Sequence, residues 1–317
     1  MAASVPATSE SGNIKRTPRR STVALAVCVT PFDRKGALDL ISLQRHVERI
    51  VDAGLGVCVG GSGTEEGFAL SKDERRAVVD TAVAAAAGRV EVRLNALEPR
   101  TPDEMVSELQ LAHEAGCDRI HVPILDPGHG FRPSPDELIA YLAVICREAK
   151  TPVVISTSAA MGPLMPIDVL RRAAAEWGIT GIVCGTPELA YVAQAMKHVG
   201  DLAEVYVASF PQLLNALTLG GAGFLSPEAN VAPELCGRLL RSWDACQYTE
   251  ALDTAGPLLR LSAIILSHGV TATVKALLRG LGLLDAYCRP PRLELHDSVA
   301  DQLTMEVGTI LALEVAK

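Results

Sequence analysis

The chain has 317 residues, of which 49% are hydrophobic and 21% are charged, so it can build a large core and long disorder is not expected. Its formal net charge is −8, and this acidic balance argues against sequence-independent nucleic-acid binding, which requires a basic face. No apolar run approaches the ~18 residues that a membrane-spanning helix needs. The eight cysteines have neither CxxC nor zinc-ligand spacing, which favours reduced thiols in a cytoplasmic protein.

Residues 1–20 are polar and then basic, without the apolar segment of a secretory signal, and we expect a disordered tail there. After it, short apolar runs alternate with longer helical patterns. The runs are almost continuously hydrophobic, as parallel strands buried on both faces should be. Eight runs are predicted as strands, at residues 23–30, 56–60, 90–95, 119–125, 152–157, 181–184, 204–209 and 223–226.

Helices are predicted between these strands from apolar periodicity and from start signals. Ser71, followed three residues later by Glu74, forms a capping box. The helix predicted over 101–115 carries a proline in its first turn. After the eighth strand only helical patterns follow, at residues 233–245, 250–267, 273–287 and 298–315.

Eight strand–helix units without a break in composition favour an α/β fold, the closed (β/α)₈ TIM barrel, over an open doubly wound sheet. The open sheet is the second choice of fold, because the chain lacks the glycine-rich phosphate-binding turn that such a sheet carries after its first strand. The predicted organisation is a disordered tail over residues 1–20, a barrel over 21–232 and a C-terminal helical extension of the same domain over 233–317.

Four segments occur in an order and spacing that resemble one known family. They are TPFD at 30–33, SGTEE at 62–66, GGAGFLS at 220–226 and VKAL at 274–277. Together they are similar to the dihydrodipicolinate synthase / N-acetylneuraminate lyase superfamily, from about Val23 to the C-terminus. The resemblance implies a barrel fold, aldolase or lyase chemistry, and association into dimers or tetramers.

Enzymes of that superfamily use a lysine on strand six to form an imine, a tyrosine after strand five to carry protons, and a loop after strand two to hold a keto-acid carboxylate. The resemblance places Val183 at the lysine position and Ser156 at the tyrosine position, and the arginine that follows in the family is missing. In the carboxylate loop Thr64 is retained, Glu65 stands where the family has glycine, and Glu66 matches the family's glutamate.

No other lysine is expected to replace the missing one. An imine requires an amine of lowered pKa at the carboxyl end of a barrel strand. None of the seven lysines ends a predicted strand, so all are expected to be solvated surface side chains: Lys15, Lys35, Lys72, Lys150, Lys197, Lys275 and Lys317.

The segment 126–133, DPGHGFRP, offers different chemistry, because it is the only predicted strand-end loop with a histidine. We predict Asp126 and His129 as catalytic acid and base, since histidine transfers protons well near neutral pH. Arg132 is predicted to grip a substrate carboxylate. The alternative is a proline- and glycine-rich loop with incidental polar residues. His121 lies within strand four, and the sequence leaves its direction open.

Side chains at other strand ends are predicted to bind substrate. They are Thr64, Glu66, Ser156, Thr157, Cys184 and Ser226. Three alternatives stay open: Glu66 holding loop backbone, Cys184 as a buried thiol, and the serine and threonine cluster at 156–158 hydrogen-bonding loop backbone.

A metal site made from Asp126, His129 and one of Glu65 or Glu66 is a further alternative, but no paired-histidine spacing supports it, and we expect neither a metal nor another cofactor. The sequence thus predicts a lyase-like enzyme that acts on a small carboxylate- or carbonyl-bearing substrate by acid/base chemistry without an imine. The alternative is a non-catalytic metabolite-binding pseudoenzyme. The expected partners are a small molecule and further copies of the chain, with no nucleic acid and no membrane.

Overall fold

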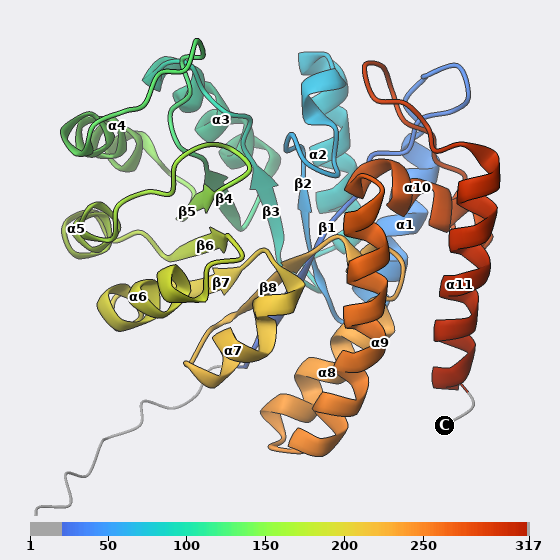
Figure 1. Cartoon of the computed structure of the whole chain (residues 1–317). Helices are drawn as coiled ribbons and strands as arrows, with labels where there is room; N and C mark the ends of the chain where they lie inside the picture. The colour runs from blue at the N-terminus through green and yellow to red at the C-terminus, as the bar shows by residue number, and fades with distance from the viewer. Residues whose placement is uncertain (1–20, 316–317) are drawn as a thin grey trace, which may run out of the picture.

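The computed structural model describes residues 21–315, which form a closed barrel of eight parallel strands in the order β1 to β8 (Figure 1). This confirms the predicted (β/α)₈ barrel with a C-terminal helical part. The predicted tail at residues 1–20 lies outside the described residues. The strands are β1 (Val23–Val27), β2 (Gly56–Val59), β3 (Val92–Asn95), β4 (Arg119–Val122), β5 (Val153–Ser158), β6 (Gly181–Gly185), β7 (Glu204–Val207) and β8 (Gly223–Ser226).

All eight predicted strands are present, but several end earlier than expected. β1 ends at Val27 and β4 at Val122, whereas their apolar runs continue to Thr30 and Leu125. Residues such as Val29 are buried outside the ladder, so hydrophobicity alone does not mark where strand pairing stops.

The helices follow the predicted pattern, and the Ser71–Glu74 capping box is formed. The exception is the helix predicted over 273–287, which ends at Gly280. The helices around the strands are α1 (Leu40–Asp52), α2 (Lys72–Ala86), α3 (Pro102–Ala115), α4 (Pro135–Glu148), α5 (Ile167–Trp177), α6 (Leu189–Val199), α7 (Leu213–Thr218) and α8 (Pro233–Asp244). Short 3₁₀ turns precede α2, α7 and α8: η1 (Gly67–Ala69), η2 (Phe210–Gln212) and η3 (Glu228–Asn230).

The chain continues after α8 into α9 (Tyr248–Ser267), α10 (Val270–Gly280) and α11 (Asp297–Val315). Figure 1 shows these helices, orange to red, gathered beside β8 and α1. Among the described helices none is by itself long and apolar enough to cross a membrane. The pair α9 and α10 would meet that test together, but a bend of 118° separates them.

Strand side chains divide between the lumen and the surrounding helices, because successive residues of a strand point to opposite faces. A small lumen cluster contains residues from six strands: Leu25, Cys58, Val154, Val183, Tyr206 and Leu225. A separate, larger cluster fills the space between the strands and the helices. The lumen is thus a packed core whose upper end opens at the carboxyl ends of the strands.

Charged side chains fill the amino-terminal end of the lumen. Arg93 is fully buried, donates to the Tyr206 hydroxyl at 2.9 Å and pairs with Glu91 at 2.7 Å. Arg119 pairs with Glu91 at 2.7 Å and with Glu204. Two arginines and two glutamates therefore balance one another, which limits the cost of burying charge at this end.

Gly223 pairs with Val23 where β8 closes the barrel against β1, and it provides a test of barrel closure. It has φ 144, and a Cβ there would lie 1.9 Å from the carbonyl oxygen of Val23. We expect Gly223→Ala to lower the free energy of unfolding by about 3 kcal/mol in urea denaturation, because backbone must move to admit the methyl group.

The matched control is Gly308→Ala in α11, where a Cβ meets only one atom, at 3.9 Å. This change should raise stability by about 0.5–1 kcal/mol, since alanine favours a helix more than glycine does. Equal losses in the two variants would contradict the role given to Gly223.

Candidate functional site

The carboxyl ends of the strands form the candidate site, here called the barrel mouth, as expected for this architecture. On β5, Ser156 and Ser158 share the lumen face with Val154 and are partly exposed. Ser156 is in register with Val183 of β6, which is only 2% exposed. Solvent therefore reaches the strand ends, and apolar Val183 lies just beneath them.

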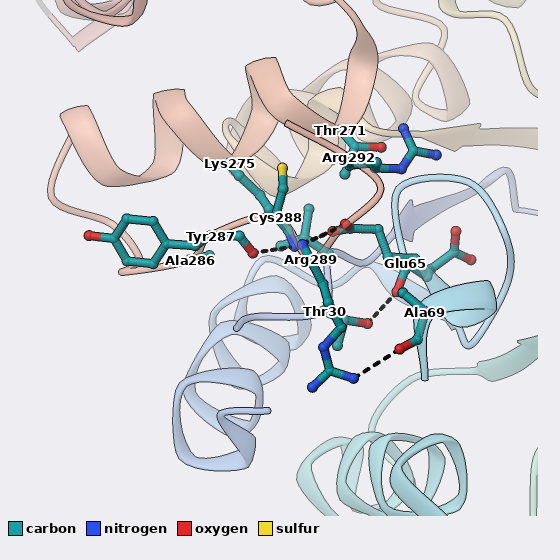
Figure 2. Close-up of polar contacts among 12 residues, drawn as sticks. Thr30, Glu65, Ala69, Thr271, Lys275, Ala286, Tyr287, Cys288, Arg289 and Arg292 are labelled. Carbon is teal, nitrogen blue, oxygen red and sulfur yellow. Dashed lines mark hydrogen bonds and ion pairs between the residues drawn. The ribbon is translucent and has the colours of Figure 1, made fainter. Parts of the chain in front are cut away.

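None of the eight strands contains a lysine. The expectation that every lysine is a solvated surface side chain is nevertheless wrong for Lys275 in α10, which is fully buried. Its ammonium donates to the Tyr287 carbonyl at 2.8 Å (Figure 2). It also pairs with Glu66 and lies 4.6 Å from the centre of the Phe32 ring. These three partners compensate the buried charge. The sequence around Lys275 does not reveal them.

Glu66 is fully buried and has left-handed backbone with φ 52. One carboxylate oxygen accepts from Lys275, and the other accepts from the Arg289 backbone N–H at 3.2 Å. Both oxygens are thus engaged within the protein. These contacts fit the alternative in which Glu66 holds the loop, and they leave no oxygen aimed at the mouth.

The segment after α10 holds the loop between β2 and α2 in place through arginine hydrogen bonds. Arg289 donates to the Ala69 carbonyl at 2.9 Å (Figure 2). It also donates to Glu74 at 2.9 Å. Arg292 donates to the Ser62 carbonyl at 3.3 Å. The loop between β2 and α2 is therefore positioned by residues of the C-terminal helical part.

Glu65 places a carboxyl group at the mouth that the sequence did not single out as catalytic. Its side chain is 1% exposed and accepts from the amide of Asn95, the last residue of β3. Its backbone carbonyl accepts from the Thr30 hydroxyl at 2.5 Å. Glycines lie on both sides: a Cβ on Gly61 would be 3.0 Å from one carboxyl oxygen, and a Cβ on Gly63 would be 3.3 Å from the other.

Burial and, to a smaller extent, the nearby Glu98 carboxylate raise the pKa of the Glu65 carboxyl to about 7. Hydrogen bonds from the Asn95 amide and from the Gly61 and Glu65 backbone act in the opposite direction but do not cancel the burial effect. Within the described residues no arginine, lysine or histidine forms an ion pair with Glu65. A buried carboxyl that titrates near neutral pH can hold or release a proton under physiological conditions.

The predicted catalytic residues Asp126 and His129 lie in the loop between β4 and α4, and both are exposed. Asp126 accepts from the Gly128 backbone N–H at 2.9 Å, and His129 has φ 53. Arg132 is also exposed and donates to the Phe131 carbonyl at 3.1 Å. No hydrogen bond joins the aspartate, histidine and arginine in this described loop, so the structure does not assemble them into a site.

Three predicted substrate ligands point away from the lumen. Cys184 belongs to the outer core, and burial raises the pKa of its thiol to about 12. Its register partner Thr157 accepts from the Met165 backbone N–H at 2.8 Å. Ser226 is fully buried and donates to Glu228 at 2.6 Å. These side chains serve packing and loop backbone, whereas Ser156 faces the lumen and Thr64 is a buried residue of the β2–α2 loop.

His121 faces the lumen, which settles the direction that the sequence left open. Its Nε2 lies 3.3 Å from a guanidinium nitrogen of Arg93. Burial, with Arg93 and Arg119 nearby, holds the pKa of His121 well below its usual range, so the ring is neutral. Across the described residues, no three histidine, cysteine, aspartate or glutamate side chains gather in a way that could hold a metal ion.

Comparisons with known proteins agree on one family. The model of the dihydrodipicolinate synthetase family matches residues 20–309. The chain is 33% identical over 293 residues to a 4-hydroxy-tetrahydrodipicolinate synthase of Ruegeria pomeroyi, covering 87% of this chain and 93% of that protein. It is 31% identical over 273 residues to a 4-hydroxy-tetrahydrodipicolinate synthase of Rhizobium meliloti, covering 85% and 91%.

Solved structures share the fold. The dihydrodipicolinate synthase from Aquifex aeolicus superposes with a TM-score of 0.83 at 23% identity, covering 91% of this chain and 97% of that one. The N-acetylneuraminate lyase from Mycoplasma synoviae gives a TM-score of 0.79 at 21% identity, with the same coverage of 91% and 97%. These likenesses show that the chain shares the barrel fold of these proteins.

The buried pair of Lys275 and Glu66 provides a stability test. We expect Lys275→Met to lower the free energy of unfolding by about 3–5 kcal/mol in urea denaturation, because it leaves the Glu66 carboxylate buried without a cation. The double variant Lys275→Met with Glu66→Gln should recover most of that loss. A single variant within 1 kcal/mol of the wild type, by the same rough scale, would contradict the pairing.

Glu65 makes stability depend on pH. Its folded-state pKa of about 7 exceeds the ordinary value of 4.5, so the folded chain binds this proton more tightly than the unfolded chain does. The resulting stability is fully present below about pH 4.5 and is lost as pH rises to about 7. Glu65→Gln should therefore match the wild type at pH 4 and exceed it by up to about 3 kcal/mol at pH 8.

Urea denaturation at several pH values measures this difference. Glu98→Gln is the matched control, because it removes a partly exposed carboxylate near the mouth and should give a smaller pH-dependent gain. A constant difference between Glu65→Gln and the wild type across this pH range would rule out the raised pKa.

Proposed function

This chain belongs to the dihydrodipicolinate synthetase family, and we propose that it is a lyase that acts on a small carboxylate- or carbonyl-bearing substrate without forming a lysine imine. The observation that carries the proposal is the lumen-facing Val183 beneath the mouth, at the position where the family resemblance calls for lysine. Valine has no nucleophile, so bond cleavage must proceed through proton transfer instead.

The placement of Lys275 supports this reading. Its ammonium is held by Glu66, the Tyr287 carbonyl and the Phe32 ring, behind the β2–α2 loop. An imine-forming lysine needs a free amine that touches the substrate carbonyl. With this amine engaged in a buried ion pair, elimination, hydration, retro-aldol cleavage or cyclisation would depend on acid/base groups.

In this proposal the β4–α4 loop closes over the mouth when substrate binds. Closure brings Asp126 and His129 to the substrate as acid and base, and brings Arg132 to its carboxylate, while Thr64 and Ser156 orient it. The turn around His129 supports this, because Gly128 and Gly130 have φ 84 and φ 72 and no atom lies within 4 Å of a Cβ at either. Such glycines can absorb the backbone rotation that loop closure needs.

Self-association and a cytoplasmic location are part of the same proposal. Exposed leucines at seven-residue intervals on α9 support self-association, because they give one face of the helix an apolar stripe: Leu252, Leu259 and Leu266.

The second candidate function is a non-catalytic protein that binds a metabolite. Val183 and Ser156 favour it, because they offer an apolar surface and one hydroxyl at the positions where the resemblance calls for lysine and tyrosine. Thermal shift against a panel of 2-keto acids and aldehydes separates the candidates, because binding without turnover supports the second one.

Trapping with borohydride tests the imine-free mechanism. With pyruvate and sodium borohydride, mass spectrometry of the intact wild-type chain should show no covalent adduct, since reduction traps only an imine. The matched control is Val183→Lys, whose amine would enter the apolar lumen and should become labelled because desolvation lowers its pKa. An adduct on the wild-type chain would overturn the proposal.

A further inference from the structure

Glu65 is a carboxyl group at the barrel mouth that the fold buries without a cation. The buried Glu66 is paired with Lys275. Glu228 is also buried and forms no ion pair with a described residue, but it accepts from the Ser226 hydroxyl on the helix side of β8. Glu65 accepts hydrogen bonds but forms no ion pair with any described residue, although it is 1% exposed. Burying a carboxyl in this way opposes folding, so a group of this kind points to a function.

We propose that Glu65 is the acceptor of the first proton of the reaction, which it takes from the carbon next to the carbonyl of a bound keto acid or aldehyde. Asp126 and His129 remain the acid and base of the later proton transfers. The inference rests on the proposed function. In the step, the C–H bond breaks and its electron pair forms the C=C bond of an enolate, while the carbonyl π pair moves to oxygen. The carboxylate of Glu65 gains the proton and returns it to carbon in the reverse step, so no other reactant is needed.

The first support is the position of the carboxyl on the lumen side of β3. Its hydrogen-bond donor Asn95 shares the lumen face of β3 with Arg93, which contacts Tyr206 inside the barrel. The carboxyl group therefore accepts its hydrogen bond on the lumen side of β3.

The second support is the room that two glycines leave for this side chain. A Cβ on Gly61 would lie 2.6 Å from the Asn95 Cβ and 3.0 Å from a Glu65 carboxyl oxygen. A Cβ on Gly63 would lie 3.3 Å from the other oxygen. The loop thus accommodates a carboxylate only because its neighbours lack side chains, and it holds that carboxylate in one orientation.

The third support is the set of groups around Glu65. The Asn95 amide donates to its carboxylate, and the Thr30 hydroxyl donates to its backbone carbonyl. Burial and the charge of Glu65 raise the pKa values of the Cys28 and Cys58 thiols. From the loop after β3, Glu98, which accepts from the Ser62 hydroxyl, adds a like charge. None of these groups is a cation, so the carboxylate is a stronger base than an ordinary glutamate.

Hydrogen–deuterium exchange tests the inference directly. Pyruvate and 2-oxobutanoate are incubated in D₂O with the full chain, and loss of the proton signal next to the carbonyl is followed by NMR. The wild type should catalyse exchange that rises with pH to a plateau above about 7, because the carboxylate form accepts the proton. Glu65→Gln, which preserves shape and the Asn95 hydrogen bond, should slow exchange by about 100-fold.

Parallel variants make the outcomes distinct. Glu98→Gln should shift the midpoint of the pH profile to lower pH, because it removes the like charge that raises the pKa of Glu65. Circular dichroism verifies that each variant is folded. If Glu65→Gln exchanges protons as fast as the wild type while Asp126→Asn or His129→Gln does not, this inference fails and the proposed function stands. A wild type that exchanges the protons of neither probe contradicts the proposed function, and this inference with it.

Discussion

Each strand residue of this barrel faces either the narrow lumen or the surrounding helices, and its place in the alternation decides which. On β5 this puts Ser156 and Ser158 on the lumen side, while Thr157 between them accepts from loop backbone outside it. On β6 it separates Val183 from the adjacent Cys184. Because a slip of one residue exchanges the two faces, register controls which polar groups can ever touch a substrate.

The fold is largely predictable from the chain because its signals are local. Continuous apolar runs mark the eight strands, and the Ser71–Glu74 box marks the start of α2. Strand ends are less predictable, since buried residues such as Val29 continue the apolar run after the ladder of hydrogen bonds has stopped. Hydrophobicity reports burial, and burial extends beyond strand pairing.

The candidate site is much less predictable, because its properties arise from residues far apart in sequence. Lys275 looks like a surface lysine until Glu66, 209 residues away, provides a counter-charge inside the protein. The raised pKa of Glu65 depends on burial and on Glu98, neither of which its own segment reveals. The one local signal was a glutamate where the family resemblance places glycine. Ser226 and Cys184 were assigned to the mouth because strand ends were identified without the face of each residue.

The contacts between the segment after α10 and the β2–α2 loop affect the order in which the protein can fold during its synthesis. Synthesis runs from the amino terminus, and strands can begin to associate while later segments are still on the ribosome. The loop that carries Glu65 and Glu66 emerges early, yet Lys275, Arg289 and Arg292, which fix it, are translated 209 to 230 residues later. A nascent barrel therefore carries an unfinished mouth until α10 and the segment after it leave the exit tunnel. The order of translation thus delays ligand binding until α10 and the segment after it can pack against the β2–α2 loop.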